Sequence, residues 1–335
     1  MPTTSFTEQE LDNIYAFAVQ LGKNAGHLLL DIAQSRCKGE ETQEAAEKDS
    51  SVDIVTKTDE VDVEAFIKTS ISQRYPDHAF VGEESYSKGS SRHYLINDST
   101  PTWCVDPLDG TVNYTHLFPM FCVSIAFVVG GMPVIGVVSA PMLGQLFTAC
   151  RGRGAWLNET HRLPLLRDPT IPPLPAGAPT GCIFSCEWGK DRKDHLHGNL
   201  YRKVESFLNM AAELGGRGGK GGMVHGVRSL GSATMDLVYT AMGAFDIWWE
   251  GGCWEWDVAA GIAILQEAGG LITTANPPED PSTAQIEDVG LGSRLYLAIR
   301  PAGPSATESG REGQERTVRE VWRRVRNLDY NRPGT

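Results

Sequence analysis

The 335-residue sequence lacks several features that would assign it to a common class of proteins. It has no run of about 20 apolar residues that would span a bilayer, and residues 1–10 carry no basic segment followed by an apolar stretch. No Cys-x-x-Cys pair occurs, so a structural zinc site is not predicted. The seven cysteines are scattered, mostly in apolar runs, which favours free thiols in a reducing compartment. We therefore expect a cytoplasmic protein.

Basic residues are scarce as well. The chain has 30 Lys and Arg against 42 Asp and Glu, a formal net charge of −12 at pH 7. Binding along a nucleic acid or an anionic membrane needs an excess of cations, so neither partner is expected. An acidic balance is compatible with binding metal cations. Hydrophobic residues make up 41% of the chain, which predicts a folded protein with a sizeable core.

Apolar residues recur every three or four positions over residues 11–32 and 59–74, which predicts two amphipathic helices. Between residues 121 and 149 the pattern changes to short β-branched and aromatic runs separated by turn residues, which indicates an antiparallel meander. Further along the chain we expect helices over residues 232–242, 257–268 and 315–327 and a strand over 245–249.

This order of elements predicts a layered fold of mixed α+β and α/β character. Residues 164–181 are rich in Pro and Gly and indicate a loop or a junction between subdomains. We therefore expect an N-terminal α+β subdomain over residues 1–180 and a C-terminal α/β subdomain over residues 181–335. Residues 301–313 are expected to form a linker.

Residues 216–221 match the letters of the dinucleotide fingerprint G-x-G-x-x-G. That fingerprint needs a strand before it, whereas a helix is predicted over residues 204–214. The segment is not a P-loop either, because Lys220 is followed by Gly instead of Ser or Thr. We expect a surface loop, whose Arg217 and Lys220 are candidates for contact with a substrate anion.

Two carboxylates lie close together in residues 103–113, which read WCVDPLDGTVN. The apolar start of this segment indicates a buried strand, and Asp106 and Asp109 come at its end. Gly110 permits a tight turn, and its amide and that of Thr111 are suited to an oxyanion if a helix begins there. Mg²⁺ prefers carboxylate oxygens, so the pair is a candidate metal site. An Asp-x-x-Asp pair is also typical of a simple turn.

Two further acidic segments strengthen the metal hypothesis. Glu83 and Glu84 follow the apolar residues 79–81, and Asp257 follows Trp256 at the start of a predicted helix. Asp257 taken alone is equally typical of a helix cap. A magnesium site draws its carboxylates from several segments, and these segments supply them.

Three segments, residues 82–85, 103–113 and 256–261, resemble the signature blocks of the inositol monophosphatase family. They occur in the same order and at similar separations. Residues 53–59 and 225–232 resemble two flanking segments of that family. Several independent segments therefore indicate the same family.

The resemblance covers roughly residues 10–300 and implies a fold and an activity. The implied fold is the αβαβα layered sandwich of the inositol monophosphatase and fructose-1,6-bisphosphatase superfamily. The implied activity is Mg²⁺-dependent, lithium-sensitive hydrolysis of a small phosphorylated polyol, with two or three Mg²⁺ ions bound, by an enzyme that is expected to be a homodimer. The glycine-rich segment and the tryptophans before Asp257 resemble a fungal branch of the family associated with quinate utilisation.

The resemblance also implies roles for individual residues. The implied metal ligands are Glu83, Asp106, the carbonyl of Leu108, Asp109 and Asp257. The implied catalytic residues, which would orient and deprotonate the attacking water, are Glu83, Thr111 and Asp59. The implied substrate contacts are Asp109, Gly110, Thr111, Ser232, Ala233, Glu250 and Asp257.

These roles predict a phosphoric monoester hydrolase that acts on inositol monophosphate or a similar polyol or sugar phosphate. Trp254 and Glu255 stand where many relatives carry His-Cys, so the leaving alcohol stays open. One alternative is a phosphatase of the same superfamily for a nucleoside bisphosphate or fructose bisphosphate, with Lys190, Arg192 and the cations of the glycine-rich segment available for the second phosphate. Another is a non-catalytic metabolite-binding protein linked to quinate metabolism.

Overall fold

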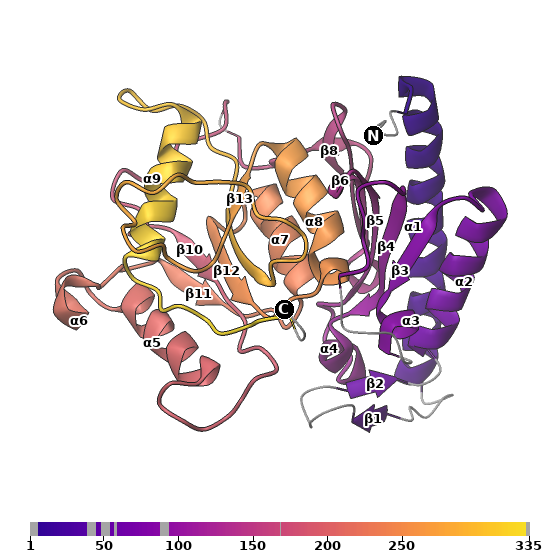
Figure 1. Cartoon of the computed structure of the whole chain (residues 1–335), viewed down its shortest axis with the longest axis horizontal. Coiled ribbons are helices and arrows are strands. Elements are labelled where there is room, and N and C mark those ends of the chain that lie inside the picture. Colours follow the sequence, from indigo (N-terminus) through magenta and orange to yellow (C-terminus); the bar gives the residue numbers. More distant parts are fainter. Residues whose placement is uncertain are drawn as a thin grey trace.

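The computed structural model describes residues 6–38, 45–47, 54–56, 59–87, 94–167 and 169–332. Their helices and strands form five layers (Figure 1): α1 and α2, a seven-stranded sheet, α7 and α8, a five-stranded sheet, and α5 with α9. The layered αβαβα arrangement implied by the resemblance is therefore confirmed.

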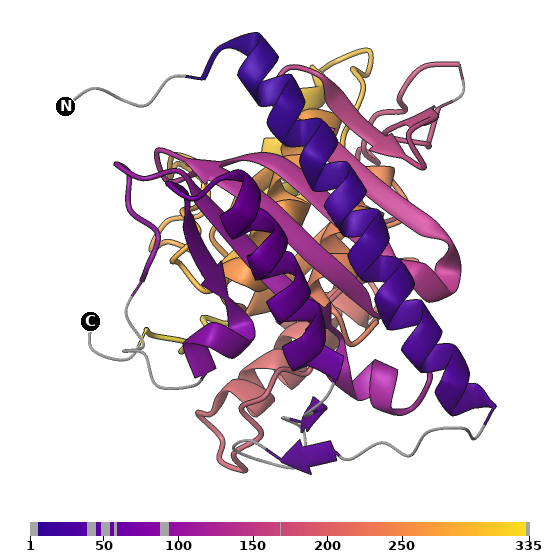
Figure 2. The ribbon, with the colours of Figure 1, turned by 90° about the vertical axis from the view of Figure 1, so that its right-hand side faces the viewer.

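The outer layer on one side consists of α1 (Glu8–Cys37) and α2 (Asp59–Arg74), at the positions where the apolar spacing predicts helices. Thr7 caps α1, because its side chain accepts the N–H of Glu10 while the Glu10 carboxylate accepts the N–H of Thr7. Figure 2 shows α1 crossing the sheet obliquely with α2 beside it. The buried face of α1, which includes Ile14 and Leu21, packs on that sheet.

The seven-stranded sheet follows the order of the chain from β3 to β9. Strands β3 and β4 are parallel and every later pair is antiparallel, which confirms the predicted meander. The strands are β3 (Ala79–Gly82), β4 (Thr102–Asp109), β5 (Cys122–Val129), β6 (Met132–Ala140), β7 (Gln145–Cys150), β8 (Gly154–Leu157) and β9 (His161–Arg162).

Short elements lie around this sheet. A separate antiparallel pair consists of β1 (Ala45–Glu47) and β2 (Ile54–Thr56). The short helices are α3 (Glu83–Ser87), α4 (Thr111–Thr115) and the 3-10 turn η1 (Pro141–Leu143). Helix α3 begins with Glu83 directly after β3, and α4 begins at Thr111, separated only by Gly110 from Asp109, the last residue of β4.

The central layer consists of α7 (Ala233–Met242) and α8 (Glu255–Ala268), both near their predicted bounds. Alternate residues of β4 face opposite layers: Cys104 belongs to the apolar cluster around α7 and α8, whereas Trp103 belongs to the cluster around α1. Helix α8 approaches β6 closely at Gly136, where a Cβ atom would lie 2.3 Å from the carbonyl oxygen of Ala260. The helix is thus held directly against the sheet.

The second sheet has the strand order β11-β10-β12-β14-β13. Its strands are β10 (Ile183–Ser185), β11 (Gly226–Arg228), β12 (Ile247–Gly251), β13 (Leu271–Thr273) and β14 (Leu295–Ile299). Helices α5 (Asn199–Ala211) and α9 (Gly310–Trp322) cover its outer face. The strands of the first sheet precede the Pro- and Gly-rich residues 164–181 in the chain, and the strands of the second sheet follow them. The subdomain boundary at residue 180 stays a prediction.

Helix α9 corrects one expectation. It begins at Gly310, inside the stretch expected to be a linker, because Ser309 and Glu312 form a capping box there. It also ends at Trp322, before the predicted end at residue 327. The indole N–H of Trp322 donates to the carbonyl of Thr274 at 3.0 Å, which fixes this end of the helix to the second sheet.

The glycine-rich segment forms α6 (Gly216–Gly219), a short turn with left-handed backbone at Arg217 and Gly218. It follows α5 and its glycines are largely exposed, as expected for a surface loop. All seven cysteines are free, and all but Cys37 are buried. Within the described ranges, no helix has the length and hydropathy needed to cross a membrane.

We expect Gly136→Ala to lower the free energy of unfolding by about 1–3 kcal/mol, since the new methyl group would collide with the backbone of α8. Chemical denaturation measures the change. Gly290→Ala is the matched control, because no atom lies within 4 Å of the Cβ position there. Equal stability of the two variants would contradict this account of the contact between α8 and β6.

Candidate metal centre and active site

Parallel pairing of β3 and β4 brings two predicted acids to one edge of the first sheet. Gly82 of β3 pairs with Val105 of β4, and Glu83 and Asp106 are the next residues of the two segments. The Asp106 side chain is only 1% exposed. It accepts the N–H of Leu108 at 2.9 Å, and the register of β4 shifts just beyond it.

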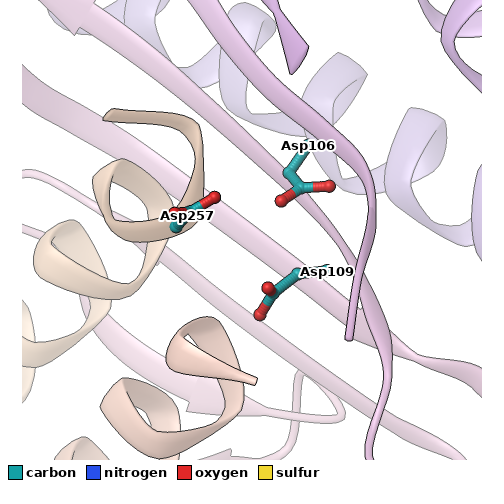
Figure 3. A group of neighbouring side chains, drawn as sticks. All are labelled: Asp106, Asp109 and Asp257. Carbon is teal, nitrogen blue, oxygen red and sulfur yellow. The ribbon is translucent and has the colours of Figure 1, made fainter. Parts of the chain in front are cut away.

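Three aspartates converge from two elements of the fold. One carboxylate oxygen from each of Asp106, Asp109 and Asp257 lies within 4.8 Å of the other two. Figure 3 shows the side chains from β4 and from the first turn of α8 directed into the same space. Glu83 lies outside this group of three and lines the same cavity. Hard divalent cations take such oxygen ligands, so the residues present fit Mg²⁺.

Burial and mutual repulsion govern the charge of this group. Burial raises the pKa of Asp106, and the carboxylates of Glu83, Asp109 and Asp257 raise it further. Burial likewise raises the pKa of Asp257, with Asp109 adding to the effect. The pKa of Asp109 is raised by burial and held down in part by its hydrogen bonds. A bound cation therefore competes with protons for these oxygens.

The start of α7 is fastened to Asp109. Ser232 caps this helix and its hydroxyl donates to the carboxylate of Asp109, while the N–H of Thr234 donates to the same oxygen at 2.9 Å. The hydroxyl of Thr234 donates to the carbonyl of Asp257 at 2.8 Å. The carboxylate of Asp257 in turn accepts the N–H of Trp254 at 2.7 Å. Both central helices are thus tied to the acidic group by their first turns.

The turn after β4 has the conformation that its glycine predicts. Gly110 has φ of 87°, and a Cβ atom there would lie 2.8 Å from the carbonyl oxygen of Met120. Thr111 begins α4, and its hydroxyl donates to the carbonyl of Leu108 at 3.2 Å. Asp59 begins α2, but its side chain lies outside the described residues, so its pairing with Thr111 stays a prediction.

A cavity of about 490 Å³ unites the predicted site. Arg217 and Lys220 of the glycine-rich segment are absent from its described walls, whereas Lys190 and Arg192 line it. The predicted site residues in its walls are Glu83, Asp106, Leu108, Asp109, Gly110, Thr111, Ser232, Ala233, Glu250 and Asp257.

Glu250 has protein partners on three sides. It forms an ion pair with Lys203 of α5, and both side chains are at most 4% exposed. Its carboxylate also accepts the N–H groups of Glu187 at 2.7 Å and of Gly251 at 2.9 Å. A carboxylate has about four lone-pair positions, which leaves about one for a substrate hydroxyl. Burial raises the pKa of Glu250, and the ammonium of Lys203 opposes that effect.

The cavity also contains residues that the sequence did not single out: Glu187, Trp188, Arg294 and Tyr330. Glu187 accepts the N–H of Gly231 at 2.9 Å and the hydroxyl of Ser229 at 2.7 Å, so it holds the loop before α7 in place. These partners lie more than 40 positions away in the chain. No local spacing or motif signals such a contact.

Comparisons with known proteins agree with this geometry. The family model described as "Inositol monophosphatase family" matches residues 10–326. The "Quinic acid degradation cluster protein x" of Neurospora crassa is 73% identical over the whole of both chains. "Inositol monophosphatase 2" of Saccharomyces cerevisiae is 39% identical, covering 76% of this chain and 78% of its own. The solved inositol monophosphatase from Anabaena, 23% identical, superposes with a TM-score of 0.66 over 95% of this chain and 97% of that one, and so shows the same fold.

Magnesium is expected to stabilise the protein more at pH 8 than at pH 5.5. The raised pKa values mean that the folded state binds more protons than the unfolded state, so metal-free stability falls as the pH rises from about 4 toward those values. Cation binding reverses this loss and adds about 2.7 kcal/mol at 100 times its Kd.

Thermal unfolding with and without Mg²⁺ measures this effect. Asp257→Asn should abolish most of the shift, while Asp288→Asn, at an exposed acid outside the cavity, should leave it intact. An equal increase of the melting temperature by Mg²⁺ at both pH values would contradict the competition between Mg²⁺ and protons.

Proposed function

The chain belongs to the inositol monophosphatase family, and from this premise we propose that it is a Mg²⁺-dependent phosphomonoesterase for inositol monophosphate or a similar polyol or sugar phosphate. Family membership supports a phosphatase of this superfamily. The observation that carries the proposal is the convergence of Asp106, Asp109 and Asp257 in one cavity beside Glu83. Acids this close together, with Asp106 buried and the other two aspartates partly buried, are costly to keep charged unless a cation neutralises them.

The proposed metal ligands are four of the carboxylates of the cavity wall and one backbone carbonyl: Glu83, Asp106, Leu108, Asp109 and Asp257. When bound, two or three Mg²⁺ ions would supply an activated water and neutralise charge on the phosphoryl group. The protein's part is to hold the oxygens rigidly. The hydrogen bonds from Leu108 to Asp106 and from Thr234 to Asp109 do so.

The phosphoryl group would lie against the turn after β4. The backbone N–H groups of Gly110 and Thr111 stand where β4 ends and α4 begins, and both residues line the cavity. Such N–H groups stabilise the negative charge of a phosphoryl oxygen. We assign orientation and deprotonation of the attacking water to Glu83, with the Thr111 and Asp59 pair as its proposed support.

The leaving alcohol would lie toward the second sheet. Ser232 and Ala233 line that part of the cavity at the start of α7, and Glu250 offers its remaining oxygen position to a hydroxyl group. The ammonium of Lys203 favours the charged, hydrogen-bond-accepting form of Glu250 and so opposes the effect of burial, which raises the pKa of Glu250. A polyol is therefore a suitable leaving group.

One observation favours a second candidate substrate class. Lys190 and Arg192 line the cavity, so a bisphosphate of a sugar or nucleoside would find cations for its second phosphate. A non-catalytic role linked to quinate metabolism is suggested only by the name of a relative. The presence of every implied metal ligand favours catalysis over that role. On family grounds we also propose lithium sensitivity, a homodimer and a cytoplasmic location.

We expect Asp257→Asn and Glu83→Gln each to lower kcat for Mg²⁺-dependent phosphate release by about 100-fold or more, because each removes charge from the proposed metal site. Asp288→Asn is the control, and circular dichroism shows whether each variant is folded. Substantial turnover by folded Asp257→Asn would contradict the metal assignment.

A panel of phosphate esters in Mg²⁺ should show release from inositol monophosphate or another polyol phosphate, and lithium in the millimolar range should inhibit it. Phosphate assays with and without lithium measure both effects. Preferred hydrolysis of a bisphosphate would favour the second candidate. No hydrolysis of any ester by the folded, Mg²⁺-loaded protein would contradict the proposed function.

A further inference from the structure

Cationic side chains in and next to the cavity wall differ in whether a carboxylate neutralises their charge. The ammonium of Lys203, just behind the wall, is paired with Glu250. Arg294 is a cavity residue, partly buried, and forms no ion pair with a carboxylate of the described residues. The carboxylate of Asp257 acts on Arg294 only from beyond ion-pair distance. Since a partly buried charge without an ion pair is costly, Arg294 is a side chain of this wall that would gain from an anion.

The guanidinium of Arg294 is held in a fixed position. It stacks on the ring of Trp254, with its central carbon 3.8 Å from the ring centroid. It donates to the carbonyls of Gly252 at 2.9 Å and Asn331 at 3.2 Å, which uses two of its five N–H groups. Its Nε–H group is buried without a hydrogen-bond acceptor in the part of the chain that the structure describes. Burial lowers the pKa of Arg294.

The backbone around Arg294 is strained and is supported by neighbouring segments. Arg294 itself has φ of 62°, a conformation that side chains other than Gly seldom adopt. The carbonyl of Asn331 is fixed because Asn199 exchanges two hydrogen bonds with the backbone of Asp329, at 2.7 and 2.8 Å. Tyr330, between them, packs its ring on Gly252 and lines the cavity. The site around Arg294 is thus built before any ligand arrives.

A second arginine on the same indole ring provides a contrast. The guanidinium of Arg332 lies 5.2 Å from the ring of Trp254 and forms a buried ion pair with Glu255 at 2.5 Å. Arg332 does not line the cavity. Both arginines contact Trp254. Arg332, outside the cavity, forms an ion pair with a carboxylate, whereas Arg294, in the cavity wall, forms none with the described residues.

We propose that the leaving alcohol carries a second anionic group, a carboxylate or a phosphate, which pairs with Arg294. This inference rests on the proposed phosphatase function and, within the polyol and sugar phosphates proposed above, selects those with a second anion over inositol monophosphate. The acids of β4 and α8 would hold the cations that neutralise the reacting phosphate, and Arg294 would bind the second anion on the wall formed by Trp254 and Tyr330. Lys190 and Arg192 add positive charge to the same cavity.

Paired substrates test the inference. Glycerol 2-phosphate and 2-phosphoglycerate differ in one hydroxymethyl group replaced by a carboxylate, and fructose 1-phosphate and fructose 1,6-bisphosphate differ in a second phosphate. We expect the wild-type protein to have the higher kcat/KM for the anionic member of at least one pair, and the preferred pair identifies the anion. Arg294→Gln should lower that preference about 10- to 100-fold, mainly through KM. Arg294→Lys should keep part of it.

The matched control is the double variant Arg332→Gln with Glu255→Gln, which removes the buried pair on the same ring outside the cavity. It should keep the wild-type preference, and chemical denaturation shows whether each variant is folded. If Arg294→Gln lowered kcat/KM equally for both members of a pair, the inference would be overturned. Such a result would mean that Arg294 has a structural role or contacts the reacting phosphate. Absence of a preference in the wild type would overturn it as well.

A binding measurement separates this inference from the proposed function. Thermal shifts with the same paired esters, in Ca²⁺ in place of Mg²⁺, compare binding without requiring turnover. If no ester is hydrolysed but the anionic member binds more tightly through Arg294, the proposed activity fails and the anion site stands. If hydrolysis occurs and both members bind equally, the activity stands and the inference about Arg294 is wrong.

Discussion

Repulsion among three close carboxylates, one buried and two partly buried, governs the arrangement of the elements around the cavity. Asp106, Asp109 and Asp257 lie within 4.8 Å of one another, and burial raises the pKa of each. Such a group destabilises the metal-free protein at neutral pH unless protons or cations compensate it. A protein that keeps these acids together gains a strong and rigid cation site. Backbone N–H groups of Leu108, Thr234 and Trp254 donate hydrogen bonds to the three carboxylates and orient them.

Rigid elements from both halves of the chain hold this group. Asp106 and Asp109 lie on a strand with neighbours on both sides, and Asp257 lies in the first turn of a helix packed against the sheet at Gly136. The cap of α7 is hydrogen-bonded to Asp109 as well. The central helix layer therefore connects the proposed metal ligands of the first sheet to the proposed substrate side of the second. Sites on such elements are more precise than sites on loops alone.

The charged residues of the cavity wall differ in whether the protein itself compensates their charge. Glu250 has Lys203 and Glu187 has backbone and hydroxyl donors, so these acids are satisfied by the protein. Arg294 has carbonyls and an aromatic face but no carboxylate among the described residues. The three aspartates Asp106, Asp109 and Asp257 need cations, whereas Arg294 needs an anion, which suits a substrate with a phosphate and a second negative group.

The sequence by itself determined the features that depend on neighbours in the chain. Apolar periodicity predicted the helix that runs from Glu8 to Cys37, and the family blocks marked Asp106 and Asp257 as acids of one site. The limits of α9 were missed because a capping box at Ser309 outweighed the linker-like composition. Only the tertiary structure decided which charges around the cavity have partners. Compensation depends on distances between side chains from separate elements, and no spacing along the chain encodes them.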